Sequence, residues 1–355
     1  MMRRFVFGLF LSLILFSCKD DEGEQYSATP APLDTPDLFQ SLLSSPLIPE
    51  TNPQTVEGIA LGRKLFYDPI LSGDGTQACA NCHGSQNTFT DPLRFSIGID
   101  GIAGNRNSMP LFNMAWNFNE KFFWDGRAST LEEQVFDPIE NPIEMHNTSE
   151  NAVASLQATI EYPEMFASAF GTPTINRTLV SKAIAQFERT LISANSKFDQ
   201  HLLGTATLTV SEANGLAIFM DETKGDCFHC HGNPNSPLWT DNAFHNNGLD
   251  DVFTDRGLGE FTGDPRDFGL FKSPSIRNLA YSAPYMHDGR FNTLDEVINH
   301  YSDGLIFSPT IDPLMKTIAQ GGVQLTQTDK DDLKAFLLSL SDPSFLNNPD
   351  FQNPN

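Results

Sequence analysis

Two copies of the five-residue pattern C-x-x-C-H constrain this chain more than any other feature. The first is Cys79-Ala80-Asn81-Cys82-His83, and the second is Cys227-Phe228-His229-Cys230-His231. In this pattern the two thiols form thioethers with the vinyl groups of a haem, and the adjacent His ligates the iron. One copy alone could be a zinc half-site or a redox dithiol. Two copies in a chain that also carries an export leader predict two covalently bound haem c groups.

The N-terminus has the features of such a leader. Arg3 and Arg4 precede an apolar run, 5–16, that is too short for a comfortable membrane span. Leu15-Phe16-Ser17-Cys18 resembles a bacterial lipobox, so we expect residues 1–17 to be a signal peptide and Cys18 to be lipidated. Ordinary cleavage, with Cys18 removed or left free, is the alternative. We therefore expect an exported protein, in the periplasm or at the cell surface, held to the outer membrane by its lipid alone.

The chain is strongly acidic, with 22 Lys and Arg residues against 45 Asp and Glu residues and a formal net charge of -23. Such a surface repels nucleic acid and favours basic protein partners. A small basic cytochrome c would suit it as an electron donor. Solubility alone is an equally good explanation of the charge.

The second half of the chain repeats the first half in order. Each half has a helix-like apolar pattern before its haem motif and a capping-box pattern near its end. The matched segments are Phe89-Thr90-Asp91 with Trp239-Thr240-Asp241, Gly98-Ile99-Asp100 with Gly248-Leu249-Asp250, Trp124-Asp125-Gly126-Arg127 with His287-Asp288-Gly289-Arg290, and Thr130-Leu131-Glu132-Glu133 with Thr293-Leu294-Asp295-Glu296. Strand signals are sparse. The predicted fold is mostly α, with two tandem, duplicated cytochrome c-like haem domains, long loops and little β structure.

The repeat also predicts the domain boundaries. After the signal peptide we expect a lipid-anchored linker, two haem domains and a tail, at residues 18–50, 51–205, 206–342 and 343–355 respectively. Helices that wrap and join the domains are expected near Ser149–Ala158, Asn176–Leu191 and Asp329–Leu340.

The repeat further predicts a difference between the two haems. A haem iron has two axial positions, and the His of each C-x-x-C-H motif fills one of them. Tyr301 follows His287 by fourteen residues, and Pro138 follows Trp124 at the same spacing. Tyr can ligate iron, whereas Pro cannot. We therefore expect a closed second haem and a first haem open to a small oxidant, which favours an enzyme over a plain electron carrier.

These motifs resemble those of the bacterial di-haem cytochrome c peroxidase family and its MauG-type branch. Besides the two haem motifs, the resemblance rests on W-D-G-R-A-x-x-L-E-x-Q from Trp124, N-P-x-E-M from Asn141 and A-P-Y-x-H-D-G-R from Ala283. It spans Gly58 to Tyr301. It implies that the N-terminal domain is peroxidatic and that the C-terminal domain transfers electrons.

The resemblance also implies roles for single residues. Trp124 matches the Trp that mediates electronic contact between the two haems. Gln134 and Glu144 match the polar pair of the open distal pocket. A carboxylate beside bound peroxide can take the proton from one oxygen and return it to the leaving oxygen. Gln134 would orient the oxidant or its water, while Glu140 is interpreted as an ordinary surface acid.

One calcium ion between the domains is implied in the same way. Asn107 matches its side-chain ligand, and the main-chain carbonyls of Ser282 and Pro284 would complete the site. Ligation by oxygen alone suits this hard cation.

Two departures from the family pattern point to the MauG-type branch. Many peroxidases of the family begin with a His that closes the first haem, and the matching position here is Ile99. Their usual ligand closing the second haem is Met, and the matching position is Tyr301. Met286 and Met315 are rival ligands. In the MauG-type branch the paired haems store two oxidising equivalents, and some members oxidise Trp or a similar residue in a partner protein.

The sequence therefore predicts a di-haem c-type oxidoreductase. It would reduce hydrogen peroxide with electrons from a small cytochrome c or similar donor. The first alternative is peroxide-dependent oxidation of Trp or another residue in a partner protein. The second, of a different class, is a non-catalytic electron-transfer lipoprotein.

Overall fold

The computed structural model describes residues 26–354, so the predicted signal peptide and Cys18 lie outside the described residues. The described part is mostly helical with one two-stranded antiparallel sheet, which confirms a mostly α fold with few strands. None of its helices is long and apolar enough to cross a bilayer. The elements are α1 Asp37–Leu42, α2 Val56–Tyr67, α3 Cys79–Cys82, α4 Leu131–Gln134, α5 Phe136–Glu140, α6 Ser149–Gln157, α7 Glu161–Phe170, α8 Arg177–Thr190, α9 Lys197–Leu202, α10 Val210–Phe219, α11 Phe228–His231, β1 Phe244–His245, α12 Leu258–Thr262, β2 Phe271–Lys272, α13 Leu294–Asp303, α14 Gln327–Ser339 and α15 Pro343–Leu346.

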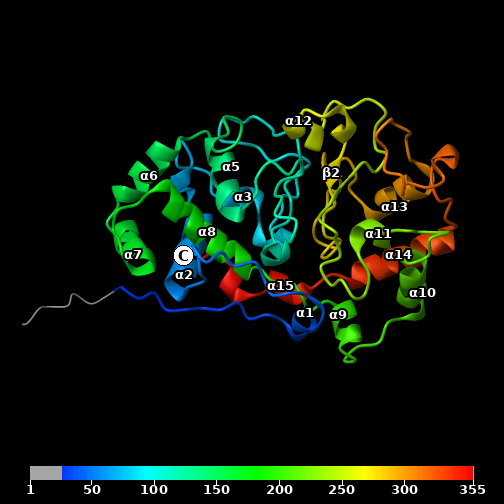
Figure 1. Ribbon diagram of the computed structural model, residues 1–355, viewed down its shortest axis with the longest axis horizontal. Helices are drawn as coiled ribbons and strands as arrows, with labels where there is room; N and C mark the ends of the chain where they lie inside the picture. Colours follow the sequence, from blue (N-terminus) through cyan, green and yellow to red (C-terminus); the bar gives the residue numbers. More distant parts are fainter. Residues whose placement is uncertain (1–25, 355) are drawn as a thin grey trace, which may run out of the picture.

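The first half of the chain is built on the packing of α2 against α8 (Figure 1). Thr55 caps α2 by accepting a hydrogen bond from the Gly58 main-chain nitrogen. Gly62 brings the two helices into contact, because a Cβ there would lie 1.8 Å from the Ala183 carbonyl oxygen. The core between these helices and the first haem loop is apolar and aromatic, with Phe66, Phe89 and Phe187 all at 0% exposure.

In the second half, α10 and α14 pack closely at a glycine in the same way. A Cβ at Gly215 would lie 2.0 Å from the Asp332 carbonyl oxygen, so only Gly permits this approach. Phe219 and Phe336 from the two helices pack around the fully buried Trp239, which follows the second haem motif. All three predicted helices are present as α6, α8 and α14, each within two residues of the expected bounds.

The C-terminal segment, predicted to be a tail, belongs to the core of the first half. In Figure 1 the red segment after α14 returns to the side of the molecule that holds α2. Phe345 packs edge-on against Phe89 with ring centroids 5.8 Å apart. Arg63 donates through Nε to the Gln352 carbonyl oxygen at 2.7 Å. The core of the first half is therefore completed by residues that follow the second half in the chain.

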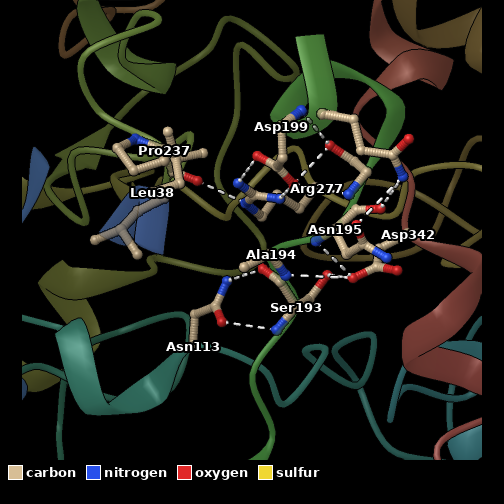
Figure 2. A network of polar contacts seen from close by, with 12 residues as sticks. Leu38, Asn113, Ser193, Ala194, Asn195, Asp199, Pro237, Arg277 and Asp342 are labelled. Atoms are coloured by element: carbon tan, nitrogen blue, oxygen red, sulfur yellow. Dashed lines mark hydrogen bonds and ion pairs between the residues drawn. The ribbon is translucent and has the colours of Figure 1, made fainter. Parts of the chain in front are cut away.

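A buried ion pair fixes the junction of the two halves. Asp199 and Arg277 are both at 0% side-chain exposure, and Arg277 donates to the carboxylate through Nη1 at 2.7 Å and Nη2 at 2.6 Å (Figure 2). Arg277 Nε also donates to the Pro237 carbonyl oxygen at 2.5 Å. Two bonds to one carboxylate and one to a carbonyl fix the guanidinium in both position and orientation.

The connection between α8 and α9 is held to both halves beside this pair. Asn113 and Ser193 exchange two hydrogen bonds, at 3.0 and 2.9 Å. The Asp342 carboxylate accepts from the main-chain nitrogens of Ala194 at 3.2 Å and Asn195 at 3.0 Å (Figure 2). Side chains from before and after the connection thus hold its main chain and keep the two halves in one arrangement.

Candidate haem sites

The first haem motif lies in the wall of a cavity of ≈ 750 Å³ in the first half. Cys79 and Cys82 begin and end α3, and the His83 ring follows them into the same wall. Neither thiol is in a disulfide, and burial raises the pKa of Cys79 to about 12 and that of Cys82 to about 11. Two half-buried thiols outside any disulfide and an imidazole, all lining one cavity, fit covalent attachment of a haem.

The hydrogen bonds of His83 prepare it to ligate a metal through Nε2. Its Nδ1 lies 2.9 Å from the Phe89 carbonyl oxygen, which places the ring proton on Nδ1. Burial lowers the pKa of His83, so the ring is neutral. Ser108 braces the motif by donating through Oγ to the Cys82 carbonyl oxygen at 2.9 Å, with the same Oγ 3.2 Å from His83 Nδ1.

The predicted distal residues Gln134 and Glu144 line this same cavity, as does Pro138. Glu144 accepts a hydrogen bond from Asn141 Nδ2 at 2.6 Å, and burial raises the pKa of its carboxyl group. The main-chain nitrogen of Ile99 donates to the Glu144 carbonyl oxygen at 2.9 Å. The loop at Ile99, where the family resemblance led us to expect a His, is therefore fixed beside Glu144 and carries an aliphatic side chain.

The second haem motif lines a smaller cavity, of ≈ 210 Å³. Cys227 and Cys230 are again outside any disulfide. Burial raises the pKa of Cys227 to about 12 and lowers that of His231 to about 4, so that this imidazole too is neutral. Ser273 Oγ donates to the Cys230 carbonyl oxygen at 3.1 Å, as Ser108 does in the first half. The donor set again fits a c-type haem.

Tyr301 reaches the second cavity from α13. Its hydroxyl accepts a hydrogen bond from Asn247 Nδ2 at 3.2 Å, and burial raises its pKa to about 12. The same Asn247 nitrogen lies 3.5 Å from Met286 Sδ. Met315 also lines the cavity, so all three candidate ligands of the second haem occupy one site.

Trp124 lines both cavities and is only 7% exposed. Its Nε1 donates to the Asn107 carbonyl oxygen at 2.8 Å. Its own carbonyl oxygen accepts from the Lys272 main-chain nitrogen at 2.9 Å, and the Asn107 main-chain nitrogen donates to the His287 carbonyl oxygen at 2.7 Å. Main-chain bonds that cross the junction in both directions therefore fix the indole in the wall between the cavities.

Of the residues predicted to bind calcium, Asn107 contacts this wall through its bond from Trp124. Asn107 is 6% exposed, and its Nδ2 donates to the carbonyl oxygens of Leu93 at 3.1 Å and Arg94 at 3.3 Å. Among residues 26–354 no group of three or more His, Cys, Asp or Glu side chains could hold a metal ion. A calcium here would therefore depend on the Asn107 side chain and on main-chain carbonyls such as those of Ser282 and Pro284.

Comparison with known proteins identifies the family. Residues 56–207 match the family model of the di-haem cytochrome c peroxidases. The methylamine utilization protein MauG of Methylophilus methylotrophus is 34% identical over 297 residues, which cover 82% of this chain and 84% of that protein. This chain belongs to the di-haem cytochrome c peroxidase and MauG family. The cytochrome-c peroxidase IdrP1 of Pseudomonas sp. (strain SCT) is 32% identical over 337 residues, covering 85% of this chain and 86% of the relative.

A solved structure supports the same family. The crystal structure of a MauG-like protein associated with microbial copper homeostasis superposes with a TM-score of 0.79 at 35% identity, covering 90% of this chain and 98% of that one. The predicted family is confirmed, and with it a peroxidase-type enzyme with two c-type haems. The relatives give no support to a non-catalytic carrier.

Two buried ionisable residues of this family member were absent from the sequence predictions. Glu188, 4% exposed, lines the first cavity, where burial raises its pKa to about 8. Lys272, 5% exposed, lines both cavities, and burial lowers its pKa to about 7. Neither lies in a recognisable motif. Ser108 and Ser273 bond the second Cys of their haem motifs in the same way, so the residues before them correspond, and Lys272 puts a cation where the first half has the amide of Asn107.

Proposed function

We propose that this protein reduces hydrogen peroxide in the first cavity, with electrons that enter at the second. The observation that carries the proposal is the difference between the two cavities. The first contains a carboxyl and an amide, Glu144 and Gln134, and is also lined by Pro138, which the sequence repeat matches to Tyr301. The second contains Tyr301 at the corresponding position. An open site with an acid–base group suits chemistry, and a closed one suits electron transfer.

The chain would hold one haem through Cys79, Cys82 and His83, and the other through Cys227, Cys230, His231 and Tyr301. When bound, the iron of the first haem supplies the site for peroxide and the electrons that break its O–O bond. Glu144 moves the proton: as a carboxylate it accepts one from the near oxygen and returns it to the leaving oxygen. Asn141 holds the Glu144 carboxyl at 2.6 Å, and Gln134 orients the oxidant. Trp124 connects the two sites.

The second candidate function is MauG-type oxidation of Trp or another residue in a partner protein. Two observations favour it: Tyr301, in place of Met, lines the second cavity, and Ile99, in place of His, lies beside Glu144. Both functions begin with the same reaction between peroxide and the first haem. They differ in where the electrons come from, a small cytochrome c or the partner protein.

Rapid mixing with peroxide separates the two. The purified two-haem protein is mixed with one equivalent of hydrogen peroxide and then with reduced cytochrome c, while both spectra are recorded. Fast and repeated oxidation of cytochrome c supports the peroxidase. A long-lived oxidised state with poor cytochrome turnover supports protein modification. The absence of any reaction with peroxide, with two six-coordinate haems at rest, would exclude both functions.

The ligand of the second haem is tested by Tyr301→Met. We expect the spectrum of the second haem to change and its reduction potential to rise, because a neutral thioether replaces a phenolic oxygen that favours the ferric state. The first haem should keep its high-spin signal. An unchanged spectrum would assign the ligand to Met286 or Met315 instead.

The connection between the haems is tested by Trp124→Phe. The variant keeps an apolar ring in the wall but loses the indole and its 2.8 Å bond to Asn107. We expect peroxide to oxidise the first haem at the normal rate, while the spectral change at the second haem is slowed or lost. Rapid-scan spectra after mixing with peroxide give both signals. Normal oxidation of both haems in this variant would remove Trp124 from the path.

We also propose a cellular location, an electron donor and a calcium ion for this protein. Covalent haem attachment and the family support export, and the lipobox-like run before Cys18 supports a lipid anchor at the outer membrane. The net charge of -23 favours a basic donor protein. One Ca²⁺ at Asn107, Ser282 and Pro284 would tie the two halves together.

Duplication of one haem domain, within bounds near 51–205 and 206–342, is supported by matched local structure. Ser108 and Ser273 bond the second Cys of each motif in the same way. Both D-G-R turns are closed by an isolated antiparallel bridge, Phe122 with Ala128 and Tyr285 with Phe291. A threonine caps the following helix in each half, although only Thr293 completes a capping box, since the Glu133 carboxylate bonds Ser129 instead of Thr130.

A further inference from the structure

Lys272 is a buried cation in the wall between the two haem cavities. It belongs to β2, which pairs with β1, and its main-chain nitrogen bonds the carbonyl oxygen of Trp124 at 2.9 Å. Its ammonium donates to the Lys121 carbonyl oxygen at 2.8 Å and lies 5.6 Å from the centre of the Phe122 ring. The main chain of Lys272 is therefore held by two neighbouring segments. Its ammonium contacts a carbonyl oxygen and an aromatic ring.

The other Lys and Arg residues that line the cavities all have carboxylate partners. Arg106 pairs with Asp125 and Asp255, Arg127 pairs with Asp125 and Asp137, and Lys316 pairs with Asp226. His245, which lines the second cavity, also pairs with two carboxylates, those of Asp241 and Asp312. Within residues 26–354, Lys272 alone among these cations has no carboxylate within ion-pair distance.

An ammonium group buried without an anion is strongly disfavoured, and in proteins such charges are paired. Each haem c carries two propionate groups, so a haem in either cavity brings carboxylates to a wall where Lys272 has no anionic partner. We propose that Lys272 is the cation that pairs with haem propionate at the junction of the two sites. The pairing holds the propionate at Trp124 and raises the reduction potential of the haem that carries it.

The direction of the effect follows from the charge. Reduction of ferric haem removes one positive charge from the iron, so a nearby cation favours the reduced form and a bare propionate favours the oxidised form. Loss of the ammonium should therefore make the potential more negative. This inference needs the two haems but not the peroxide reaction, so its test uses no peroxide, and its failure is distinct from failure of the proposed function.

Lys272→Met removes the charge and keeps most of the apolar length. The two-haem protein is titrated spectroelectrochemically, with covalent haem content measured first. We expect at least one of the two potentials to become more negative in Lys272→Met and both to stay near the wild-type values in Lys272→Arg. Lys334→Met is the matched control: Lys334 pairs with Asp295 and lines neither cavity, so both potentials should stay unchanged. Unchanged potentials in Lys272→Met would overturn the proposal.

If Lys272→Met does not accumulate with both haems, the pairing is tested with Lys272→Arg instead, by resonance Raman spectroscopy. A guanidinium fork bonds a carboxylate with different geometry from an ammonium, so the propionate bending bands should shift relative to wild type. Identical bands in Lys272→Arg would overturn the pairing.

Discussion

Glu144→Gln slows the reaction with hydrogen peroxide by about 10²–10⁴-fold, the usual effect of losing a positioned acid–base group. Gln has nearly the same shape but cannot take and return a proton. Both haems should remain attached, since Glu144 contacts Asn141 and the Ile99 main chain rather than a haem-motif residue. Stopped-flow rates of the first spectral change after mixing with peroxide measure the effect.

Two controls make this result specific. Glu140→Gln changes an acid four residues away that also lines the cavity but pairs with Arg177 at 3.1 Å. It should react at the wild-type rate. In wild type the rate should fall as the pH is lowered through the pKa of Glu144, which burial raises above 4.5, because the protonated acid cannot accept a proton. That acid limb should be missing in Glu144→Gln, and a wild-type rate there would refute the assignment.

Arg277→Met lowers the free energy of unfolding by about 3–5 kcal/mol, because it leaves the Asp199 carboxylate buried without its partner. Denaturant unfolding followed through haem absorbance and far-ultraviolet circular dichroism measures the loss. Arg266→Met is the matched control. Arg266 makes a similar pair with Asp264, but its side chain is 88% exposed, so no measurable change is expected. A loss in Arg277→Met no larger than in the control would contradict the assignment.

The pH dependence of this loss has a definite sign. Burial alone would raise the pKa of Asp199, but the charge and hydrogen bonds of Arg277 hold it below 3.8 in the native protein. The pair therefore stabilises wild type above the ordinary pKa of Asp, and this stability is lost as the pH falls through the lower native value. In Arg277→Met the pKa of Asp199 rises with burial, and protonation relieves the isolated charge. The difference between variant and wild type should therefore shrink on acidification.

The sequence was most informative where chemistry requires a local pattern. The haem-attaching residues and their His ligands follow one another in the chain, so Cys79 to His83 could be assigned without a fold. The three predicted helices were found because their apolar spacing and caps are also local. Gln134 and Glu144 came from the resemblance to the peroxidase family, and the structure places both in the lining of one cavity.

What the sequence could not reveal depends on contacts between distant segments. Phe345 looks like part of a polar tail, and only the fold brings it against Phe89. Lys272 is one Lys among many until the fold buries it without a carboxylate. Asp199 and Arg277 lie 78 residues apart and have no shared motif. Burial and pairing of charge are properties of the folded chain, and the order of its amino acids does not display them.

The crossed main-chain bonds at the wall have a consequence for the origin of the molecule. In the alignment of the two halves Asn107 corresponds to Lys272, and Trp124 corresponds to His287. The Asn107 main-chain nitrogen donates to the His287 carbonyl oxygen, and the Lys272 main-chain nitrogen donates to that of Trp124. Each half therefore donates to the other the same main-chain hydrogen bond that it accepts. This reciprocity is the signature of an isologous interface in a two-fold symmetric dimer. On the duplication proposed above, a one-haem chain would have formed this wall by pairing with its own copy. Fusion of the two copies would then have left each half free to acquire its own side chains at the shared boundary.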